Sequence, residues 1–409
     1  MTVPHKPVRS GTRCPRTRSI LANRAAARQP EDMLDPPGGA ATMAGGRQDS
    51  SEGSPPVPGD AIQFSTRAKQ MANVRIGLVG LGWWACEAHI PNLLRVEGAR
   101  IAALCSRSPE NIERGLKELG GRAQPLVFDD YEKLLASDAV DAVVICAPNH
   151  LHAPMTLAAI WAGKHVLVEK PLGLDPAECQ AIVAEAAERG IAVQVGVELR
   201  YSDVAQAMRR LIADGAIGDL ALLRTDIWRQ WGAPGSWRAD VAKSGGLFHE
   251  LGIHYIDLLC FLAGKSLQWV AATGGVKATG RDLDYAVTTL GFEGGAVASL
   301  SLCLFAAGGG NDVDIEAIGT EGRLAGSITS GTLTLWRREG RPQEYTLPRA
   351  ADEVFGFPGS RESVASFVEC VRTGGAPSAD AQVGADLCAI CEAARRSAAK
   401  GGEKTATGT

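Results

Sequence analysis

The strongest structural signal in this chain is the stretch Val74-Arg75-Ile76-Gly77-Leu78-Val79-Gly80-Leu81-Gly82-Trp83-Trp84-Ala85. An apolar run ends in two glycines one residue apart, and a segment of helical character follows. The first glycine permits a tight turn, the second lets backbone approach a pyrophosphate, and a small third residue brings the helix close to the strand. The N-terminus of that helix offers N–H groups and a positive dipole end to phosphates. The pattern predicts a dinucleotide-binding unit; the alternative is a tight turn without a ligand.

Composition bounds the remaining possibilities. With 409 residues, 45% of them hydrophobic and 22% charged, the chain can bury a core in each of two domains. A net charge of -4 gives no indication of binding to nucleic acid or an anionic membrane. No apolar run reaches the roughly 20 residues that a membrane span needs. The ten cysteines lie scattered in apolar segments, as expected for a reduced, cytoplasmic protein. A metal or redox role for the pair Cys388 and Cys391 is the alternative.

Residues 1–70 differ from the rest of the chain. They are rich in Pro, Gly, Ser, Ala and Arg and lack hydrophobic periodicity, so we expect a disordered tail. Several arginines but no acid precede Glu31, which is typical of an organelle transit peptide. The favoured alternative is an upstream extension that the working protein does not carry, because Met71 stands directly before the first strand.

From Val74 onward, predicted strands and helices alternate. Apolar runs follow the first strand at 101–105, 140–147, 165–168 and 191–195. Helical segments separate them at 109–119, 131–136, 153–162 and 176–189. This alternation predicts an α/β fold with a doubly wound parallel sheet, whose ligands bind at the carboxyl ends of the strands. We assign the dinucleotide-binding domain to residues 71–196.

The pattern changes after a helix at 204–213. A long strand is predicted at 220–231 and a buried helix at 245–262. The strand-like runs that follow lie at 269–273, 286–292, 296–303, 312–318, 323–328 and 332–336. Short turns between these runs predict a largely antiparallel sheet. Two closing helices at 360–372 and 381–399 complete an α+β domain at 197–400, which a tail at 401–409 follows.

The residues after the second strand select the cofactor. An acid at this point would bind the ribose 2′-hydroxyl of NAD. This chain instead has Ser106-Arg107-Ser108, and hydroxyls and a guanidinium attract a 2′-phosphate. We therefore predict NADP, with NAD as the alternative. Arg107 could instead be a solvated residue at the start of a helix.

Two further segments follow strands at the carboxyl edge of the sheet. In Ala147-Pro148-Asn149-His150-Leu151-His152, the restricted backbone of Pro148 and the amide of Asn149 could position the cofactor. His152 either joins them or caps a helix, and His150 fits a surface loop.

The second segment, Glu169-Lys170-Pro171, places a lysine beside the predicted nicotinamide site. Oxidation of an alcohol removes a hydride from carbon and a proton from oxygen. A partly desolvated lysine can take or direct that proton. The alternative is a Glu-Lys pair on the surface at the end of a strand.

The helix predicted at 245–262 carries Glu250 and His254, which are four residues apart and therefore share one face. Both are polar groups on an apolar helix, and a carboxylate that orients a histidine supports proton transfer. A zinc site here lacks a clear third ligand, so we predict no metal. Asp257 is expected to make a structural bond, and His249 has no assigned role.

Together these motifs resemble the Gfo/Idh/MocA oxidoreductases over residues 74–399. The matching signatures are Gly80-Leu81-Gly82, Ala147-Pro148-Asn149 with His152, Gly163-Lys164-His165-Val166-Leu167-Val168-Glu169-Lys170-Pro171 and Gly252-Ile253-His254-Tyr255-Ile256-Asp257. The resemblance implies a Rossmann domain followed by a domain with a large open sheet that commonly builds homodimers or homotetramers. It also implies NAD(P)-dependent oxidation or reduction of a hydroxyl on a sugar, sugar nucleotide or cyclitol, with no nucleic-acid or membrane partner.

By this resemblance, Lys170 contacts the reacting hydroxyl, often with a cis bond before Pro171, and His254 lies near the same hydroxyl. Glu250 stands where many members have Asp, and Glu198 where many have Asn. We predict Lys170, His254 and Glu250 as catalytic residues. The predicted cofactor-binding residues are Gly80, Gly82, Trp83, Ser106, Arg107, Pro148, Asn149, His152 and Glu169. The candidates for the substrate side are Arg200, Tyr201, Trp237 and Arg238.

Two other functions stay open at this point. One is a cofactor-binding regulator without catalysis, against which the intact Lys170 and His254 argue. The other is an NAD-dependent glycosidase of the same fold, which oxidises its substrate transiently and then eliminates a leaving group.

Overall fold

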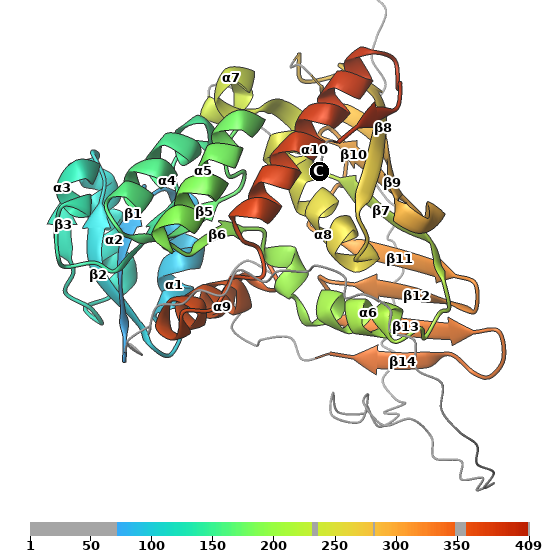
Figure 1. Cartoon of the computed structure of the whole chain (residues 1–409), viewed down its shortest axis with the longest axis horizontal. Helices are drawn as coiled ribbons and strands as arrows, with labels where there is room; N and C mark the ends of the chain where they lie inside the picture. Colours follow the sequence, from blue (N-terminus) through green and yellow to red (C-terminus); the bar gives the residue numbers. More distant parts are fainter. Residues whose placement is uncertain (1–71, 231–235, 281–282, 348–356, 408–409) are drawn as a thin grey trace, which may run out of the picture. The chain divides into compact units, whose positions relative to one another are not determined.

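The computed structural model describes residues 72–230, 236–280, 283–347 and 357–407 (Figure 1). The tail predicted at 1–70 lies outside these residues. Within them, the strands form a six-stranded sheet and a nine-stranded sheet.

The six-stranded sheet is parallel throughout and has the order β3-β2-β1-β4-β5-β6. Its strands are β1 (Val74–Val79), β2 (Ala99–Cys105), β3 (Leu126–Phe128), β4 (Ala142–Ile145), β5 (His165–Glu169) and β6 (Val193–Gly196). The strand order reverses between β1 and β4, so the predicted doubly wound sheet is confirmed. Only β3 was not predicted, because it has three residues and its first two are exposed.

Three of the helices of this part begin at caps that the sequence supplies. The helices are η2 (Ala85–His89), α1 (Ile90–Leu93), α2 (Pro109–Leu119), α3 (Tyr131–Leu135), η3 (Asn149–Leu151), α4 (His152–Trp161) and α5 (Pro176–Arg189). Ser108, Asp130 and Asp175 accept backbone N–H bonds at the starts of α2, α3 and α5. Such caps satisfy donors that have no partner within the helix.

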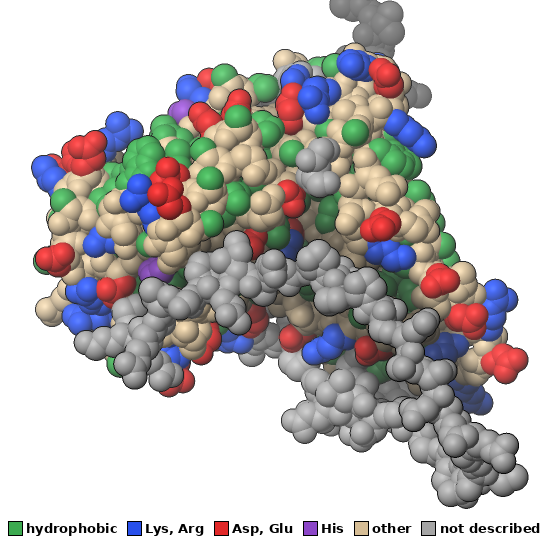
Figure 2. All heavy atoms as spheres, in the orientation of Figure 1, with side chains coloured by type: hydrophobic (Ala, Val, Ile, Leu, Met, Phe, Trp, Pro, Cys, Tyr) green, Lys and Arg blue, Asp and Glu red, His purple; other side chains and the backbone are tan. Residues whose placement is uncertain are grey.

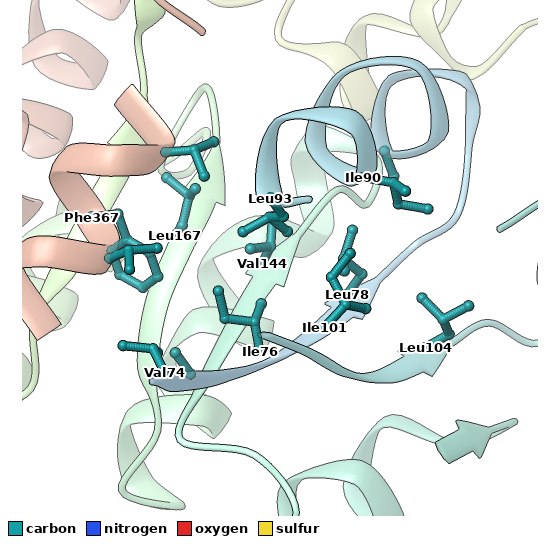
Figure 3. Close-up of a cluster of buried hydrophobic side chains, with 14 of the residues drawn as sticks. Val74, Ile76, Leu78, Ile90, Leu93, Ile101, Leu104, Val144, Leu167 and Phe367 are labelled. Carbon is teal, nitrogen blue, oxygen red and sulfur yellow. The ribbon is translucent and has the colours of Figure 1, made fainter. Parts of the chain in front are cut away.

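The core of the six-stranded sheet includes a helix from the far end of the chain. Helix α9 (Ser360–Thr373) contributes Val364, Phe367, Val368 and Val371 to the cluster that contains Ile76, Leu78 and Leu167. Figure 3 shows Phe367 reaching from α9 into this cluster. The spacing of these four residues places them on one helical face. The sequence pattern assigns α9 to the second domain, and in the structure its apolar face packs on the first sheet.

The nine-stranded sheet has the order β14-β13-β12-β11-β7-β10-β9-β8-β15. Its strands are β7 (Leu220–Trp228), β8 (Leu267–Gly275), β9 (Tyr285–Phe292), β10 (Val297–Cys303), β11 (Asp314–Gly319), β12 (Gly322–Ser327), β13 (Thr332–Arg337), β14 (Gln343–Thr346) and β15 (Thr405–Ala406). Neighbours are antiparallel except β7 and β10, which are parallel. Strand β15 lies in the predicted tail at 401–409, so part of that tail pairs with β8.

One face of this sheet is covered by helices. Figure 1 shows α6 (Asp203–Ala213), α8 (Ile253–Ala263) and α10 (Ala381–Ala399) along it. Side chains on β10 alternate between buried and partly exposed positions, as expected for a sheet that is covered on one side. On the other face, Trp228 is 49% exposed, Val287 51% and Ile318 36%. We call this face, with these three side chains, the open face.

The helix predicted at 245–262 is interrupted at its start. After α7 (Val241–Ser244), Gly245 and Gly246 adopt φ values of +78° and +73°, and the π-helix η6 (Phe248–Gly252) precedes α8. By length and composition alone, the span Val241–Ala263 is long and apolar enough to cross a membrane. The search of the sequence for long apolar runs did not find this span. Its most apolar window is 78% buried within the protein, so this apolar character belongs to the core.

One face of the described surface is mixed in charge. On the face seen in Figure 2, acidic and basic side chains are interspersed rather than gathered by sign. This distribution agrees with the small net charge of -4.

Candidate active site

A cavity of about 750 Å³ lies at the carboxyl ends of β1, β2, β4 and β5. Its opposite wall comes from η4 (Glu198–Tyr201), η5 (Trp237–Ala239), η6 and α8. The volume falls within the roughly 300–1,000 Å³ of small-molecule and cofactor sites. All nine predicted cofactor residues and all three predicted catalytic residues line this cavity.

The two glycines of the first turn meet different surroundings. Gly80 has a φ of +82°, and a Cβ on it would lie 2.5 Å from the backbone oxygen of Cys146. A Cβ on Gly82 would meet nothing within 4 Å, although the residue lines the cavity beside Trp83. Gly80 is therefore required by the turn itself, whereas Gly82 leaves room for a group to approach the backbone. This geometry fits a dinucleotide pyrophosphate.

The ends of β2 and β3 form one part of the cavity wall. Ser106 accepts a bond from the backbone N–H of Ser108 at 3.2 Å, and Ser108 caps α2. The Arg107 guanidinium makes no hydrogen bond or ion pair with the described residues and lines the cavity. Asp129 and Asp130 also line it. Sequence reasoning missed these acids because it missed β3, the strand that precedes them.

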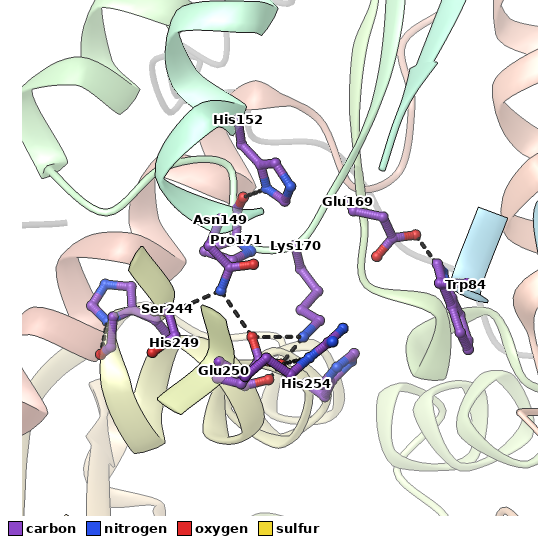
Figure 4. A network of polar contacts seen from close by, with 12 residues as sticks. Trp84, Asn149, His152, Glu169, Lys170, Pro171, Ser244, His249, Glu250 and His254 are labelled. Carbon is purple, nitrogen blue, oxygen red and sulfur yellow. Dashed lines mark hydrogen bonds and ion pairs between the residues drawn. The ribbon is translucent and has the colours of Figure 1, made fainter. Parts of the chain in front are cut away.

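Lys170 reaches from the end of β5 to the helix on the opposite wall (Figure 4). Its Nζ donates to the backbone oxygen of Glu250 at 2.8 Å and lies 3.8 Å from Glu250 Oε2. The side chain is 13% exposed. The peptide bond between Lys170 and Pro171 is cis, as the family resemblance implies.

Glu250 is the most heavily bonded carboxylate in the cavity wall. Its Oε1 accepts from Arg238 Nε at 2.7 Å, and its Oε2 accepts from Asn149 Nδ2 at 2.9 Å. Burial alone would raise the pKa of Glu250, but Lys170, Arg238 and Asn149 outweigh it and lower the pKa. Glu250 is therefore a carboxylate at neutral pH.

The predicted partner of His254 was wrong. Glu250 shares a helical segment with His254, but the contacts of its carboxylate go to Lys170, Arg238 and Asn149. The carboxylate beside the imidazole belongs to Glu198 of η4, whose Oε1 lies 3.4 Å from His254 Nδ1. The two atoms are within ion-pair distance without the alignment of a hydrogen bond. The π-helical turn at Glu250 changes the direction of its side chain from the one that a regular α-helix would give.

Asn149 and His152 form hydrogen bonds that connect the loops at the carboxyl edge of the parallel sheet. Asn149 Nδ2 also donates to the backbone oxygen of Ser244 at 2.8 Å, so it joins the two walls of the cavity. The ring nitrogens of His152 lie 2.6 Å from the oxygen of Pro171 and 2.7 Å from that of Ala147. This buried ring thus fixes the loop after β4 to the loop that carries Lys170.

Glu169 points away from Lys170 toward the first turn (Figure 4). Its Oε1 accepts from Trp84 Nε1 and lies 2.7 Å from His89 Nε2. Burial alone would lower the pKa of His89, but Cys146 and Glu169 beside it raise the pKa to about 10. The charged pair fixes the helix after the glycine turn to the end of β5.

Two residues predicted for the substrate side lie elsewhere. The guanidinium of buried Arg200 donates to both carboxylate oxygens of Asp257 and to the backbone oxygen of Ser378. Arg200 and the buried Tyr201 are absent from the cavity wall, which corrects their assignment. The structural bond predicted for Asp257 is confirmed, and its partner is Arg200. No local sequence pattern indicated this pairing, which is why Arg200 was assigned to the substrate side.

The other two substrate candidates, Trp237 and Arg238, do line the cavity, and the Arg238 guanidinium lies 4.6 Å from the centre of the Trp237 ring. Sequence reasoning missed several further wall residues. They are Glu198, which it had noted only as a family departure, and Arg229, Tyr255, Asn311 and Thr329. Apart from Glu198, only Tyr255 carried a signal, because it follows His254 in the motif.

The dinucleotide-binding turn lies in one cavity with a Lys–Glu pair and a His–Glu pair. This combination defines a class of protein, the two-domain oxidoreductases. Comparison with known proteins places the chain within that class. The model described as "Oxidoreductase family, NAD-binding Rossmann fold" matches residues 74–197, and that of the "GFO/IDH/MocA C-terminal domain" matches residues 205–325. The chain therefore belongs to the Gfo/Idh/MocA oxidoreductase family, and the resemblance and the fold class are confirmed.

Three known proteins illustrate the similarity. The chain is 26% identical to myo-inositol 2-dehydrogenase of Thermotoga maritima, with 79% of this chain and 96% of the relative covered. It is 30% identical to scyllo-inositol 2-dehydrogenase (NAD(+)) of Bacillus subtilis, with 74% and 88% covered. A levoglucosan dehydrogenase solved with NADH and levoglucosan superimposes with a TM-score of 0.75 at 22% identity, over 82% of this chain and 100% of the other. The last likeness shows the shared fold.

Proposed function

We propose that this protein is a dehydrogenase that transfers a hydride between a hydroxyl-bearing carbon of a sugar, sugar nucleotide or cyclitol and NADP. The observation that supports this most is the placement of the Lys170 ammonium. It is held 2.8 Å from the backbone oxygen of Glu250, in the same cavity as the glycine turn. The names of the two inositol dehydrogenases agree with a polyhydroxylated substrate.

The bound nicotinamide would accept or supply the hydride, and the side chains of the chain would handle the proton. Lys170 donates to the reacting oxygen and stabilises the negative charge that develops on it. His254 takes the proton, and Glu198, 3.4 Å from its Nδ1, stabilises the charged ring. Glu250 balances the ammonium of Lys170 and holds it in place.

The choice of NADP rests on the residues after β2. Ser106, Arg107 and Ser108 supply hydroxyls and a guanidinium there, and Arg107 has no ion-pair partner among the described residues. Asp130 is engaged as the cap of α3, and Asp129 pairs with Lys133 at 3.1 Å. The cation therefore remains available for a 2′-phosphate.

Replacing Arg107 with alanine should weaken NADPH binding by about tenfold, because a charge-assisted contact is lost, and should leave NADH binding nearly unchanged. Fluorescence titration of both cofactors measures this. Arg114→Ala, an exposed arginine on α2 outside the cavity wall, is the matched control. An equal loss for both cofactors would end the argument for NADP.

The proposed reaction is tested by the absorbance of reduced nicotinamide over a panel of sugars, sugar nucleotides and inositols, with NADP and with NAD. A sustained rise with one compound is expected. If cofactor binds but no compound gives a rise, the protein is not a dehydrogenase for these substrates. Release of a leaving group without net reduction would identify the redox-neutral glycosidase instead.

We also propose that copies of the chain associate through the open face. Trp228, Val287 and Ile318 place large apolar side chains there at 49%, 51% and 36% exposure. Three large apolar side chains exposed on one face of a sheet support this proposal. Analytical ultracentrifugation should give a dimer or tetramer, and Trp228→Glu should shift it toward monomer. A monomeric wild-type protein at micromolar concentration would contradict this.

A further inference from the structure

Arg229 is a buried cation in the cavity wall with a distinctive set of partners. It follows the last residue of β7 and is 6% exposed. Its Nη1 donates to the backbone oxygen of Gly310 and, at 3.0 Å, to Asn311 Oδ1; its Nη2 donates to the Tyr255 hydroxyl at 2.8 Å. All three acceptors are neutral oxygens. Among the described residues, Arg229 has no carboxylate within ion-pair distance.

The other charged groups on this side of the cavity contact one another. Glu250 is 2.7 Å from Arg238 and 3.8 Å from Lys170, and Glu198 is 3.4 Å from His254. These pairs use both carboxylates of the opposite wall. Among the described residues, neither of these carboxylates lies within ion-pair distance of the Arg229 guanidinium.

A buried charge without a counter-ion is unfavourable, and the penalty is recovered when an anion binds beside it. We propose that the substrate carries a carboxylate, and that Arg229 is the residue that binds it. The substrate class would then be polyhydroxy acids such as hexuronates, rather than neutral sugars or cyclitols. This inference rests on the proposed dehydrogenase function and narrows its substrate.

Tyr255 supplies a second donor for the same group. Its hydroxyl accepts from Arg229, and its own O–H has no acceptor among the described residues. Tyr255 follows His254 on α8, and the centres of their rings are 6.3 Å apart. A carboxylate bound by Arg229 and Tyr255 would therefore place a hydroxyl of the same small molecule near His254 and Lys170.

The geometry favours a carboxylate over a phosphate ester. One planar guanidinium with an adjacent hydroxyl matches the two oxygens of a carboxylate. A phosphate dianion would need further unpaired cations, and the nearby candidates, Lys170 and Arg238, are already engaged with Glu250.

The experiment compares matched sugars that differ only at carbon six: hexose, hexuronate and hexose 6-phosphate in the gluco, galacto and manno series. Calorimetry measures their binding to the protein saturated with oxidised cofactor, and nicotinamide absorbance measures turnover. We expect kcat/KM for one hexuronate to exceed that for the hexose by about 100-fold, as loss of a buried charge contact implies. Arg229→Gln should lower kcat/KM for the hexuronate by a similar factor, mainly through KM, and should lower it far less for the hexose.

Controls separate this effect from misfolding. Arg229→Lys keeps the charge and should retain part of the preference for the acid. Arg210→Gln, at an exposed position on α6 outside the cavity wall, should change nothing. Thermal denaturation and NADPH binding verify that each variant is folded. If Arg229→Gln is unfolded, the wild-type preference together with Arg229→Lys still decides.

The outcomes are distinct. Preference for the neutral sugar or the phosphate ester, or an equal loss on both substrates in Arg229→Gln, would overturn the carboxylate site and leave the dehydrogenase standing. Tight hexuronate binding that Arg229→Gln abolishes, without any reduction of nicotinamide, would support the site and refute the hydride transfer.

Discussion

Replacing Lys170 with alanine should lower kcat by about 10²–10⁴-fold, the range expected when a group that handles the proton of the reaction is removed. Cofactor affinity should remain near the wild-type value. The ammonium contacts Glu250 on the opposite wall and has no contact with Gly80 or Gly82. The loss should therefore appear in the chemical step and not in cofactor binding.

Single-turnover kinetics with saturating cofactor and substrate measure this effect. Lys164→Ala is the matched control, because Lys164 belongs to the same motif but donates to the backbone oxygens of Ser137 and Val140, outside the cavity. A Lys170→Ala variant that keeps most of its rate would remove Lys170 from the reaction. A loss of cofactor binding of equal size would make it a binding residue instead.

Replacing Gly82 with valine should weaken dinucleotide binding by about 100-fold, the upper end of the penalty for inserting side-chain atoms where a ligand must pack. The free protein should be as stable as the wild type. A Cβ at this position meets nothing within 4 Å, and Gly82 is not among the glycines with positive φ. The added methyl groups would therefore obstruct the ligand and not the fold.

The neighbouring glycine gives the opposite result and serves as the comparison. Gly80→Ala requires a side chain at φ +82° and a Cβ 2.5 Å from the Cys146 oxygen, so it should destabilise the folded protein itself. NADPH fluorescence and thermal denaturation of both variants separate the two effects. Wild-type cofactor binding by Gly82→Val would show that the dinucleotide does not cross the turn at this residue.

Local sequence patterns were sufficient for the parts of the site that lie on one element. The glycine turn, the Glu-Lys-Pro segment and the helix with Glu250 and His254 depend on short spacings, and all reach the same cavity. What failed depends on pairs far apart in the chain. Glu198 meets His254, and Arg200 meets Asp257, only because η4 and α8 pack together. A carboxylate in the sequence does not reveal which cation it will neutralise.

The sequence pattern also did not predict very short strands, or which sheet a helix packs against. Strand β3 has three residues, too few for an apolar period, and its omission hid Asp129 and Asp130. Helix α9 has a clear apolar face, but periodicity does not say which sheet that face will cover. No motif indicated Arg229, because what distinguishes it is that no carboxylate among the described residues lies within ion-pair distance.

The position of α9 has a consequence for the order in which the protein forms during synthesis. Phe367 and its neighbours fill the core under Ile76 and Leu167, yet the ribosome makes them after eight of the nine strands of the other sheet. The nucleotide-binding half therefore emerges first but leaves apolar surface uncovered until nearly the whole chain has been translated. Nascent chains halted before α9 should thus depend on chaperones, and the two halves should mature together rather than one after the other.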